Sequence, residues 1–337
     1  MTTDLHAPGD IGRPAAPSGD GARHGRIDVH HHYTAPEWVR WAEEKGIADR
    51  DSLPPWTRWD EATALDLMDR TGTRTSVLTV AMLGRFKEAA ARRESTRVAL
   101  DAAGALTERH AGRFAFFTPL FLDDAELSAW SVSHGMDRLG AVGVSARTST
   151  GDTYLGDPAL DPIMAQLDER GAVISTHPMQ VNTSGAPAGV PPFVCDFLMD
   201  TTRAALSLIM NGTLDRFPRL KFVLPHGGGY LPYIASRVEV FGRQLVPAVD
   251  PGRVRDCLHR FYYDTAAPMS PSGTPSLLAA AGSSQILYGS DWPPTPARVV
   301  SEVTAPALDA DPALGERERS CINRENALRL LPALARV

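Results

Sequence analysis

The chain has 337 residues, of which 43% are hydrophobic and 22% are charged, and its formal net charge is −6 at pH 7. This balance is typical of a soluble globular protein, and it gives no electrostatic reason to expect binding to nucleic acid or to an anionic membrane. The cysteines Cys195, Cys257 and Cys321 are far apart and in no metal-binding spacing, which predicts buried or semi-buried thiols in a reducing compartment. No apolar segment follows Met1 and no stretch approaches membrane-spanning length, so we expect a cytoplasmic protein.

Residues 1–25 are rich in Gly, Pro, Ala and Ser and have almost no large apolar side chains, so we expect a disordered N-terminal tail. Residues 26–337 are expected to form one domain, in which short β-branched or aromatic segments alternate with amphipathic ones. Eight strands are predicted, at Arg26–His30, Thr75–Val80, Phe114–Pro119, Ala141–Ser145, Ala172–His177, Lys221–Pro225, Phe261–Asp264 and Gln285–Tyr288.

Amphipathic helices are predicted between and after these strands, at Asp60–Arg70, Lys87–His110, Asp124–Arg138, Asp161–Arg170, Asp200–Arg216, Tyr230–Leu245, Ser270–Ala281 and Glu316–Leu331. Asp60 and Asp161 stand at helix starts and are predicted to be N-caps. Strands that alternate with helices in this way predict an α/β fold, a (β/α)₈ TIM barrel rather than an open sheet. Two long rim-loop insertions are expected after strands 1 and 5, at Tyr33–Trp59 and Pro178–Phe197, on the face where barrel enzymes carry their active sites.

Three consecutive histidines end the first predicted strand. Side chains alternate along a strand, so His30 and His32 share one face and His31 points to the other. Two imidazoles at this spacing can bind one divalent cation, although histidines that are hydrogen-bonded in a core give the same pattern. His31 is expected to pack against the surrounding helices or to support the site without binding a ligand.

Three further polar side chains stand at strand ends. His177 ends the fifth strand, and His226 follows the sixth in front of three glycines, which allow a sharp turn or a close approach to a ligand. Asp291 closes the eighth strand, where an unpaired carboxylate would be costly, although a helix N-cap is an alternative. Each signal has a structural explanation alone, but the strand ends of a barrel converge on one rim and together predict a single site.

These motifs resemble those of the amidohydrolase superfamily, in the amidohydrolase-2 branch that includes 6-methylsalicylate and aminocarboxymuconate-semialdehyde decarboxylases. The elements Asp-x-His-x-His, Thr-His-Pro, His-Gly-Gly-Gly-x-x-Pro and Gly-Ser-Asp-x-Pro occur in that family's order. The resemblance implies that His30, His32, His177 and Asp291 bind one divalent metal ion, Zn²⁺ or Mn²⁺. No lysine ends the fourth strand, where binuclear members carry one, so a mononuclear site is expected.

The resemblance also implies a catalytic pair, with His226 as general acid/base and Asp291 setting its protonation state. Arg237 fits the position of an arginine that reaches the substrate of a neighbouring subunit, which implies a homodimer, although a surface arginine in a salt bridge would look the same. Aromatic residues on the predicted rim loops are candidates for holding a ring or for packing in a lid: Tyr33, Trp38, Trp56, Phe193 and Trp292.

Two enzymatic functions fit these residues. The first is non-oxidative decarboxylation of an aromatic, salicylate-type or unsaturated carboxylic acid, with proton delivery to carbon by His226. The second is hydrolysis or hydration, as in lactonases, by a water molecule that the metal activates. A barrel without activity that serves as a scaffold is disfavoured, because every ligand position is occupied. The expected partner is therefore a small carboxylic acid, with no nucleic acid and no membrane.

Overall fold

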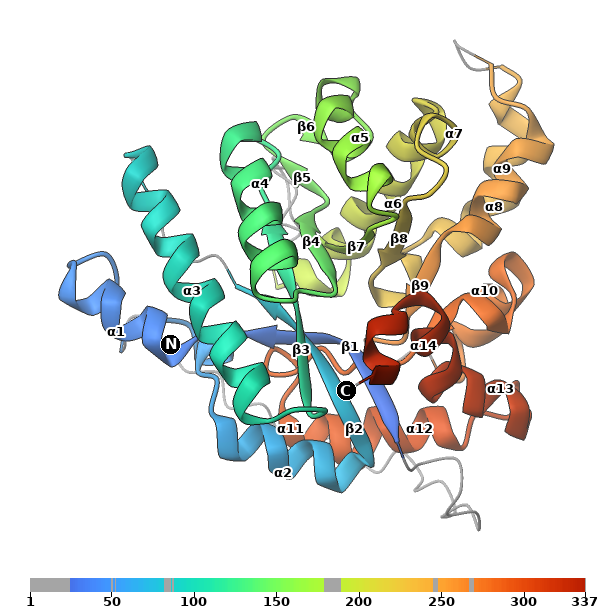
Figure 1. The fold of residues 1–337 in the computed structure, drawn as a ribbon. Coiled ribbons are helices and arrows are strands. Elements are labelled where there is room, and N and C mark those ends of the chain that lie inside the picture. The colour runs from blue at the N-terminus through green and yellow to red at the C-terminus, as the bar shows by residue number, and fades with distance from the viewer. Residues whose placement is uncertain are drawn as a thin grey trace.

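The computed structural model describes residues 25–49, 51, 53–81, 86, 88–178, 189–244, 248–266 and 270–336. A sheet of eight parallel strands forms its centre, in the order β1-β2-β3-β4-β7-β8-β9-β10 (Figure 1). These strands are β1 (Arg26–Tyr33), β2 (Thr73–Val80), β3 (Phe114–Leu120), β4 (Gly143–Arg147), β7 (Val173–His177), β8 (Lys221–Leu224), β9 (Tyr262–Asp264) and β10 (Ile286–Leu287). All eight predicted strands are confirmed. The predicted tail lies outside the described residues except for Gly25.

The sheet closes into a barrel through the segment that follows β10. The backbone N–H of Val29 donates to the Tyr288 carbonyl at 3.0 Å, and that of His32 donates to the Trp292 carbonyl at 2.8 Å. The backbone N–H of Asp291 donates to the His30 carbonyl at 2.8 Å. The predicted (β/α)₈ barrel is thus confirmed, and Asp291 is fixed against the strand that carries the histidine pair.

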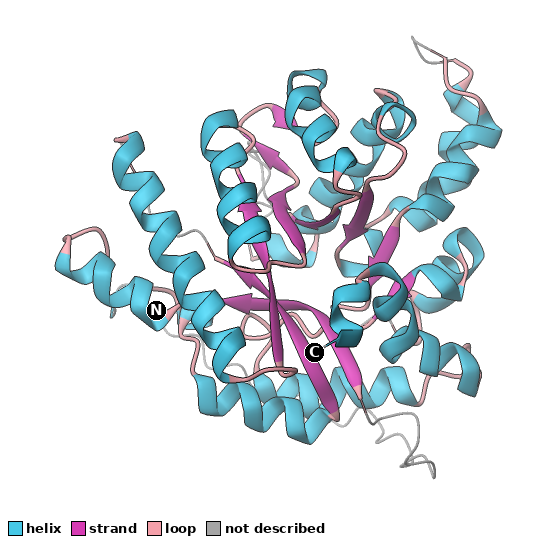
Figure 2. Cartoon of the chain, in the orientation of Figure 1, coloured by secondary structure: helices cyan, strands magenta, loops and turns pink. Residues whose placement is uncertain are grey.

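Helices surround the barrel on its outside (Figure 2). They are α1 (Pro36–Glu44), α2 (Glu61–Thr71), α3 (Ala89–Arg109), α4 (Ala125–Val132), α5 (Asp161–Glu169), α6 (Asp196–Met210), α7 (Thr213–Arg216), α8 (Leu231–Gly242), α9 (Pro251–Arg260), α10 (Thr274–Ala281), α11 (Ala297–Val299), α12 (Ala305–Asp309), α13 (Glu316–Ser320) and α14 (Asn326–Leu330). A short antiparallel hairpin, β5 (Ser149–Thr150) and β6 (Thr153–Tyr154), follows β4. Within the described part of the chain, none of the helices combines the length and hydropathy needed to cross a lipid bilayer.

Helix boundaries show where local sequence signals succeed and fail. Asp60 caps α2 as predicted, because its carboxylate accepts a hydrogen bond from the backbone N–H of Thr63 at 2.8 Å. The prediction that Asp161 is an N-cap is wrong. Leu160 takes that position, and Asp157 caps a 3₁₀ turn one turn earlier, where its carboxylate accepts from the backbone N–H of Ala159. The first rim insertion contains the helix α1, which was predicted as loop. The helices α9, α11 and α12 were not predicted either.

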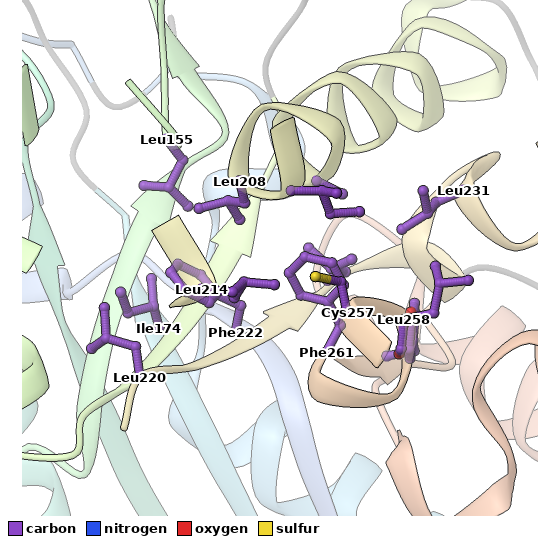
Figure 3. Close-up of a cluster of buried hydrophobic side chains, with 14 of the residues drawn as sticks. Leu155, Ile174, Leu208, Leu214, Leu220, Phe222, Leu231, Cys257, Leu258 and Phe261 are labelled. Carbon is purple, nitrogen blue, oxygen red and sulfur yellow. The ribbon is translucent and has the colours of Figure 1, made fainter. Parts of the chain in front are cut away.

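Two apolar layers hold the barrel together. Inside it, Val29 of β1 and Phe117 of β3 belong to one buried cluster with Leu330 of α14, so the C-terminal helix closes the end of the barrel away from the strand C-termini. Outside it, side chains of β7, β8, α6 and α9 pack between the sheet and the helices (Figure 3). Ile174 and Phe222 are examples, and both are fully buried. This packing fixes the strand ends on which the polar side chains stand.

A β-bulge in β1 sets the direction of the histidines. Between Asp28 and His31, β1 advances three residues while its partner β2 advances two. Val29 lies in the apolar interior of the barrel, and beyond the bulge His30 and His32 take the interior side. A bulge re-aims the side chains that follow it, so one strand supplies both barrel core and polar site.

Candidate metal centre and active site

Four side chains converge at the C-terminal end of the barrel. His30 and His32 of β1, His177 at the end of β7 and Asp291 after β10 each offer one ligand atom, and these atoms lie within 4.8 Å of one another. His30 Nε2 is 3.1 Å from His32 Nε2, and Asp291 Oδ1 is 3.0 Å from His32 Nε2. Ligands at about 2.1 Å from one ion would be about 3.0 to 3.4 Å apart. The spacing therefore fits a single metal ion.

The orientation of the rings supports the same conclusion. Nδ1 of His177 donates to the carbonyl of Pro178 at 2.9 Å, and Nδ1 of His30 donates to Asp264 Oδ2 at 2.9 Å. In both rings this leaves Nε2 directed into the group of four. Three imidazole nitrogens and one carboxylate oxygen are a donor set that suits Zn²⁺ and also Mn²⁺.

Asp264 is a buried side chain at this site to which the sequence alone assigned no role. It ends β9, is 2% exposed, and accepts hydrogen bonds from three directions. Oδ2 faces His30 Nδ1, while Oδ1 accepts from the backbone N–H of His226 at 2.8 Å and from that of Ala266 at 3.1 Å. One carboxylate thus fixes both a ligand histidine and the expected acid/base. The sequence pattern that pointed to Asp291 is also present at Asp264, because in both cases an acidic residue ends an apolar strand.

Electrostatics favour ligand-competent protonation states for two of these groups. Burial, reinforced by the charges of His32 and His30, holds the pKa of His177 well below its usual value. Burial acts to raise the pKa of Asp291, but the charge of His30 and hydrogen bonds from His226, His30 and His32 outweigh it and hold that pKa well below its usual value. Neutral imidazole and ionised carboxylate are the forms that bind metal.

His30 differs from the other ligands. Burial acts to lower its pKa, but the charges of Asp264 and Asp291 outweigh burial and hold the pKa of His30 well above its usual value. The pKa of His32 is lowered, with burial as the largest cause. A metal ion that binds to this group therefore displaces a proton from His30.

His226 lies beside the four ligand atoms but is not one of them. Its Nε2 is 3.6 Å from Asp291 Oδ2, which is the carboxylate oxygen that does not face His30 and His32. Its Nδ1 is buried without a hydrogen-bond partner among the described residues. His226 and Asp291 both have left-handed backbone, with φ of 54° and 57°, which is uncommon outside glycine. The geometry places a buried imidazole directly beside the group of four ligand candidates.

His31 points away from the site, as expected from strand alternation. Its Nε2 accepts a hydrogen bond from Trp59 Nε1 at 3.2 Å, and its Nδ1 faces Asp28 Oδ2 at 3.5 Å. The ring packs edge-on against Trp292, with 4.9 Å between ring centroids. This histidine is therefore part of the packing that supports β1.

The aromatic candidates for ring binding lie in two different surroundings. Tyr33, Trp38 and Trp292 are at most 4% exposed and belong to one hydrophobic cluster. Trp38 also donates a hydrogen bond to a serine of α3 at 2.7 Å, because α1 folds it inward from the segment predicted as a loop. Phe193 and Trp56 are exposed, by 65% and 42%. The structure brings none of the five into the group of ligand atoms, and their substrate contacts stay predictions.

Arg237 stands on the exposed side of α8. Its guanidinium carbon lies 5.1 Å above the centroid of the Phe241 ring, and it forms no ion pair with a described residue. The second rim insertion can be compared only in part, because residues 179–188 lie outside the described residues.

Replacing Asp264 with asparagine is expected to weaken metal binding by about 10- to 100-fold, as for other side chains that orient metal ligands. The amide has one acceptor oxygen and one NH₂ donor. It cannot accept both from the backbone N–H of His226 and from His30 Nδ1, so His30 loses its orientation. Titration of the metal-free protein with Zn²⁺ against a competing chelator measures the effect.

Asp168→Asn is a matched control. Asp168 is similarly buried and accepts from the backbone N–H groups of Arg219 and Leu220, but it lies where the chain enters β8, at the opposite end of the barrel. This variant is expected to change the melting temperature and leave Zn²⁺ affinity unaltered. Equal Zn²⁺ affinities for Asp264→Asn and the native protein would show that Asp264 has no part in ligand orientation.

Comparison with known proteins gives one family and several relatives. A family model described as Amidohydrolase matches residues 27–333. The 6-methylsalicylic acid decarboxylase of Penicillium expansum is 30% identical over 321 residues, which cover 92% of this chain and 97% of that one. A decarboxylase of Aspergillus niger is 29% identical, over 91% of this chain and 87% of its own. The crystal structure of an amidohydrolase II is 26% identical with a TM-score of 0.80, covering 91% of this chain and 100% of that chain.

Proposed function

Because the chain belongs to the amidohydrolase family, we propose that it is a metal-dependent decarboxylase of an aromatic carboxylic acid of the salicylate type. One observation carries the proposal: a three-histidine, one-aspartate group with a separate histidine, His226, beside it. Support comes from relatives that align over nearly their whole length and are themselves decarboxylases. The cytoplasmic location expected from the sequence stays a prediction.

His30, His32, His177 and Asp291 are proposed to hold one divalent ion, Zn²⁺ or Mn²⁺. When bound, the ion would supply a Lewis acid that orients the carboxylate and a neighbouring hydroxyl of the substrate. The chain itself contributes a site in which His30, His32 and His226 are 4%, 9% and 7% exposed. An ordered substrate in such a site needs little reorganisation before reaction.

His226 is proposed to deliver the proton. Its imidazolium donates a proton to the ring carbon that bears the carboxylate, and a new C–H bond forms as the ring loses aromaticity. The C–C bond to the carboxylate then breaks, CO₂ leaves, and the bonding electrons restore the aromatic ring. His226 ends neutral and regains a proton from solvent. Asp291 Oδ2 lies 3.6 Å from His226 Nε2 and is proposed to orient the imidazole.

Hydrolysis or hydration on the same residues is the alternative. In that case His226 or Asp291 would accept a proton from water instead of donating one to carbon. The relatives named above favour decarboxylation, and none of those names describes a lactonase.

The deciding experiment measures CO₂ release from salicylate, 6-methylsalicylate and 2,6-dihydroxybenzoate by Zn²⁺- and Mn²⁺-loaded protein. Release from at least one acid, lost after chelation and regained on reloading, is the expected result. Lactone hydrolysis without CO₂ release from any acid would overturn the proposal and favour the alternative. Metal-loaded protein that is inactive in both assays would also overturn it.

A homodimer is proposed through the exposed side of α8. Tyr233, Arg237, Val240 and Phe241 follow the helical spacing i, i+4, i+7 and i+8, and the three apolar side chains are 83%, 65% and 46% exposed. Large apolar side chains clustered on one exposed helix face are typical of an interface. In such a dimer, the guanidinium of Arg237 would be available to the second subunit, as the family resemblance implies.

Arg237→Ala is expected to raise the KM for the acid substrate by about 10-fold, the effect of losing one charge-assisted hydrogen bond. Steady-state kinetics and light scattering of the same preparation test this. Arg97→Ala, an exposed arginine of α3 with 50% side-chain exposure, is the control and is expected to be silent. Unchanged kinetics in a dimeric Arg237→Ala protein would show that Arg237 does not contribute to substrate binding.

A further inference from the structure

Arg147 stands at the mouth of the barrel beside a metal-ligand candidate. It ends β4, and in the parallel ladder it is the register partner of His177 at the end of β7. Register partners on neighbouring strands point to the same side of the sheet, and such strands are about 4.8 Å apart. The ladder continues past this pair, because the backbone N–H of Thr148 donates to the His177 carbonyl at 2.9 Å. The backbone of Arg147 is therefore held firmly.

Alternation along β4 gives the direction of the side chain. Val144 and Ala146 lie in the outer apolar layer, between the sheet and the helices. Gly143, Ser145 and Arg147 consequently face the interior of the barrel. The Arg147 side chain thus starts on the side of the sheet that carries the imidazole of His177, one strand away.

The charge of Arg147 is only weakly balanced by the described part of the chain, where Asp123 is the carboxylate whose charge acts on it. The side chain is exposed and forms no ion pair with a described residue. The nearest competing carboxylate is Asp123, but both of its oxygens accept hydrogen bonds from Arg92, at 2.8 and 3.2 Å. Partial burial lowers the pKa of the Arg147 guanidinium, and the charge of Asp123 opposes this shift. Guanidinium stays protonated at neutral pH, so a positive charge without an ion-pair partner among the described residues stands at the mouth.

The charges around the site favour a role for this cation. With neutral histidines, the carboxylates of Asp264 and Asp291 balance the two charges of a divalent ion. A carboxylate substrate then adds a negative charge, which the proposed imidazolium of His226 offsets only until its proton is transferred. Of the eight strands in the sheet, β4 is the one that ends in Lys or Arg. Arg147 is therefore a cation at the end of the barrel that carries the group of four.

We propose that Arg147 binds the carboxylate of the acid substrate and selects for acids over neutral aromatics. The assignment rests on the proposed function for the identity of the substrate class. Guanidinium offers paired N–H donors that match the two oxygens of a carboxylate. Its role is ground-state binding: the carboxylate loses its charge as CO₂ forms, so an arginine that holds it stabilises the bound acid more than the transition state.

The test measures binding separately from catalysis. Calorimetric titration of Mn²⁺-loaded protein with salicylate is compared with titration by salicylamide, which keeps the ring and hydroxyl but has no carboxylate. In Arg147→Gln, salicylate affinity is expected to fall by about 10- to 100-fold and salicylamide affinity to stay the same. Arg147→Lys should recover part of the loss, and Arg97→Gln on α3 is the silent control. Metal content and melting temperature confirm that each variant is folded and loaded.

Kinetics give a second readout. For any acid that releases CO₂, Arg147→Gln should raise KM by the same factor and change kcat by no more than a few-fold. Equal salicylate affinity in the variant and the native protein, or no salicylate binding by the native protein, would overturn the assignment. If the native protein releases no CO₂ while its salicylate affinity still depends on Arg147, the decarboxylase proposal fails and this assignment stands.

Discussion

His177→Ala is expected to abolish both metal binding and catalytic activity. His177 is the one ligand from β7, and it is held by its Nδ1 contact to the carbonyl of Pro178. Its loss removes one of the four ligands and leaves two histidines of one strand and Asp291, with no donor on the β7 side of the site. Zn²⁺ affinity should therefore fall by more than the roughly 10- to 100-fold expected for a side chain that only orients a ligand.

Metal analysis after gel filtration, together with the CO₂ assay, measures this effect. His134→Ala is the matched control, because His134 is a partly buried histidine that pairs with Asp101 at 2.8 Å, between the outer helices. It should retain full metal content. A His177→Ala protein that still binds one equivalent of metal would remove His177 from the ligand set and leave the centre to the other three side chains.

His226→Asn is expected to keep the metal and lose turnover by about 10²- to 10⁴-fold, the usual contribution of a general acid or base. Asparagine accepts left-handed backbone more readily than most residues, so the φ of 54° at this position should be preserved. The backbone N–H of residue 226 can still donate to Asp264, which keeps the neighbouring ligand His30 in place. The amide cannot supply a proton to carbon.

The two readouts of this variant separate binding from chemistry. Metal content equal to that of the native protein, with kcat reduced and salicylate affinity retained, assigns His226 to proton transfer. Loss of metal from His226→Asn would instead make His226 a ligand. Turnover within a few-fold of the native value would require a different proton donor.

The sequence predicts the barrel and the convergence of its polar side chains because both depend on local patterns. Short β-branched or aromatic segments and strand–helix alternation identify all eight strands, and a polar residue that ends an apolar strand identifies His177 and Asp291. The His30–His32 pair follows from alternation within one strand. These signals depend on a few neighbouring residues, and a parallel barrel brings strand ends together whatever the loops contain.

What the sequence does not predict depends on distant contacts. The role of Asp264 follows from its contacts with His30 and His226, which lie 234 and 38 residues away in the chain. The inward position of Trp38 follows from α1, a nine-residue helix inside a segment with several loop-forming residues. The bulge in β1 leaves no trace in composition. Such features form only when the helices and strands pack together, because tertiary packing overrides the secondary-structure propensity of a local segment.

The left-handed backbone at His226 and Asp291 has an evolutionary consequence. A non-glycine residue in this conformation costs about 1 to 2 kcal/mol, so each position opposes folding while it serves the chemistry. A lineage released from the need for activity would gain stability by changing these two residues to glycine, and it would lose the site before it lost the barrel. A descendant with glycine at both positions would be more stable and would have no catalytic activity.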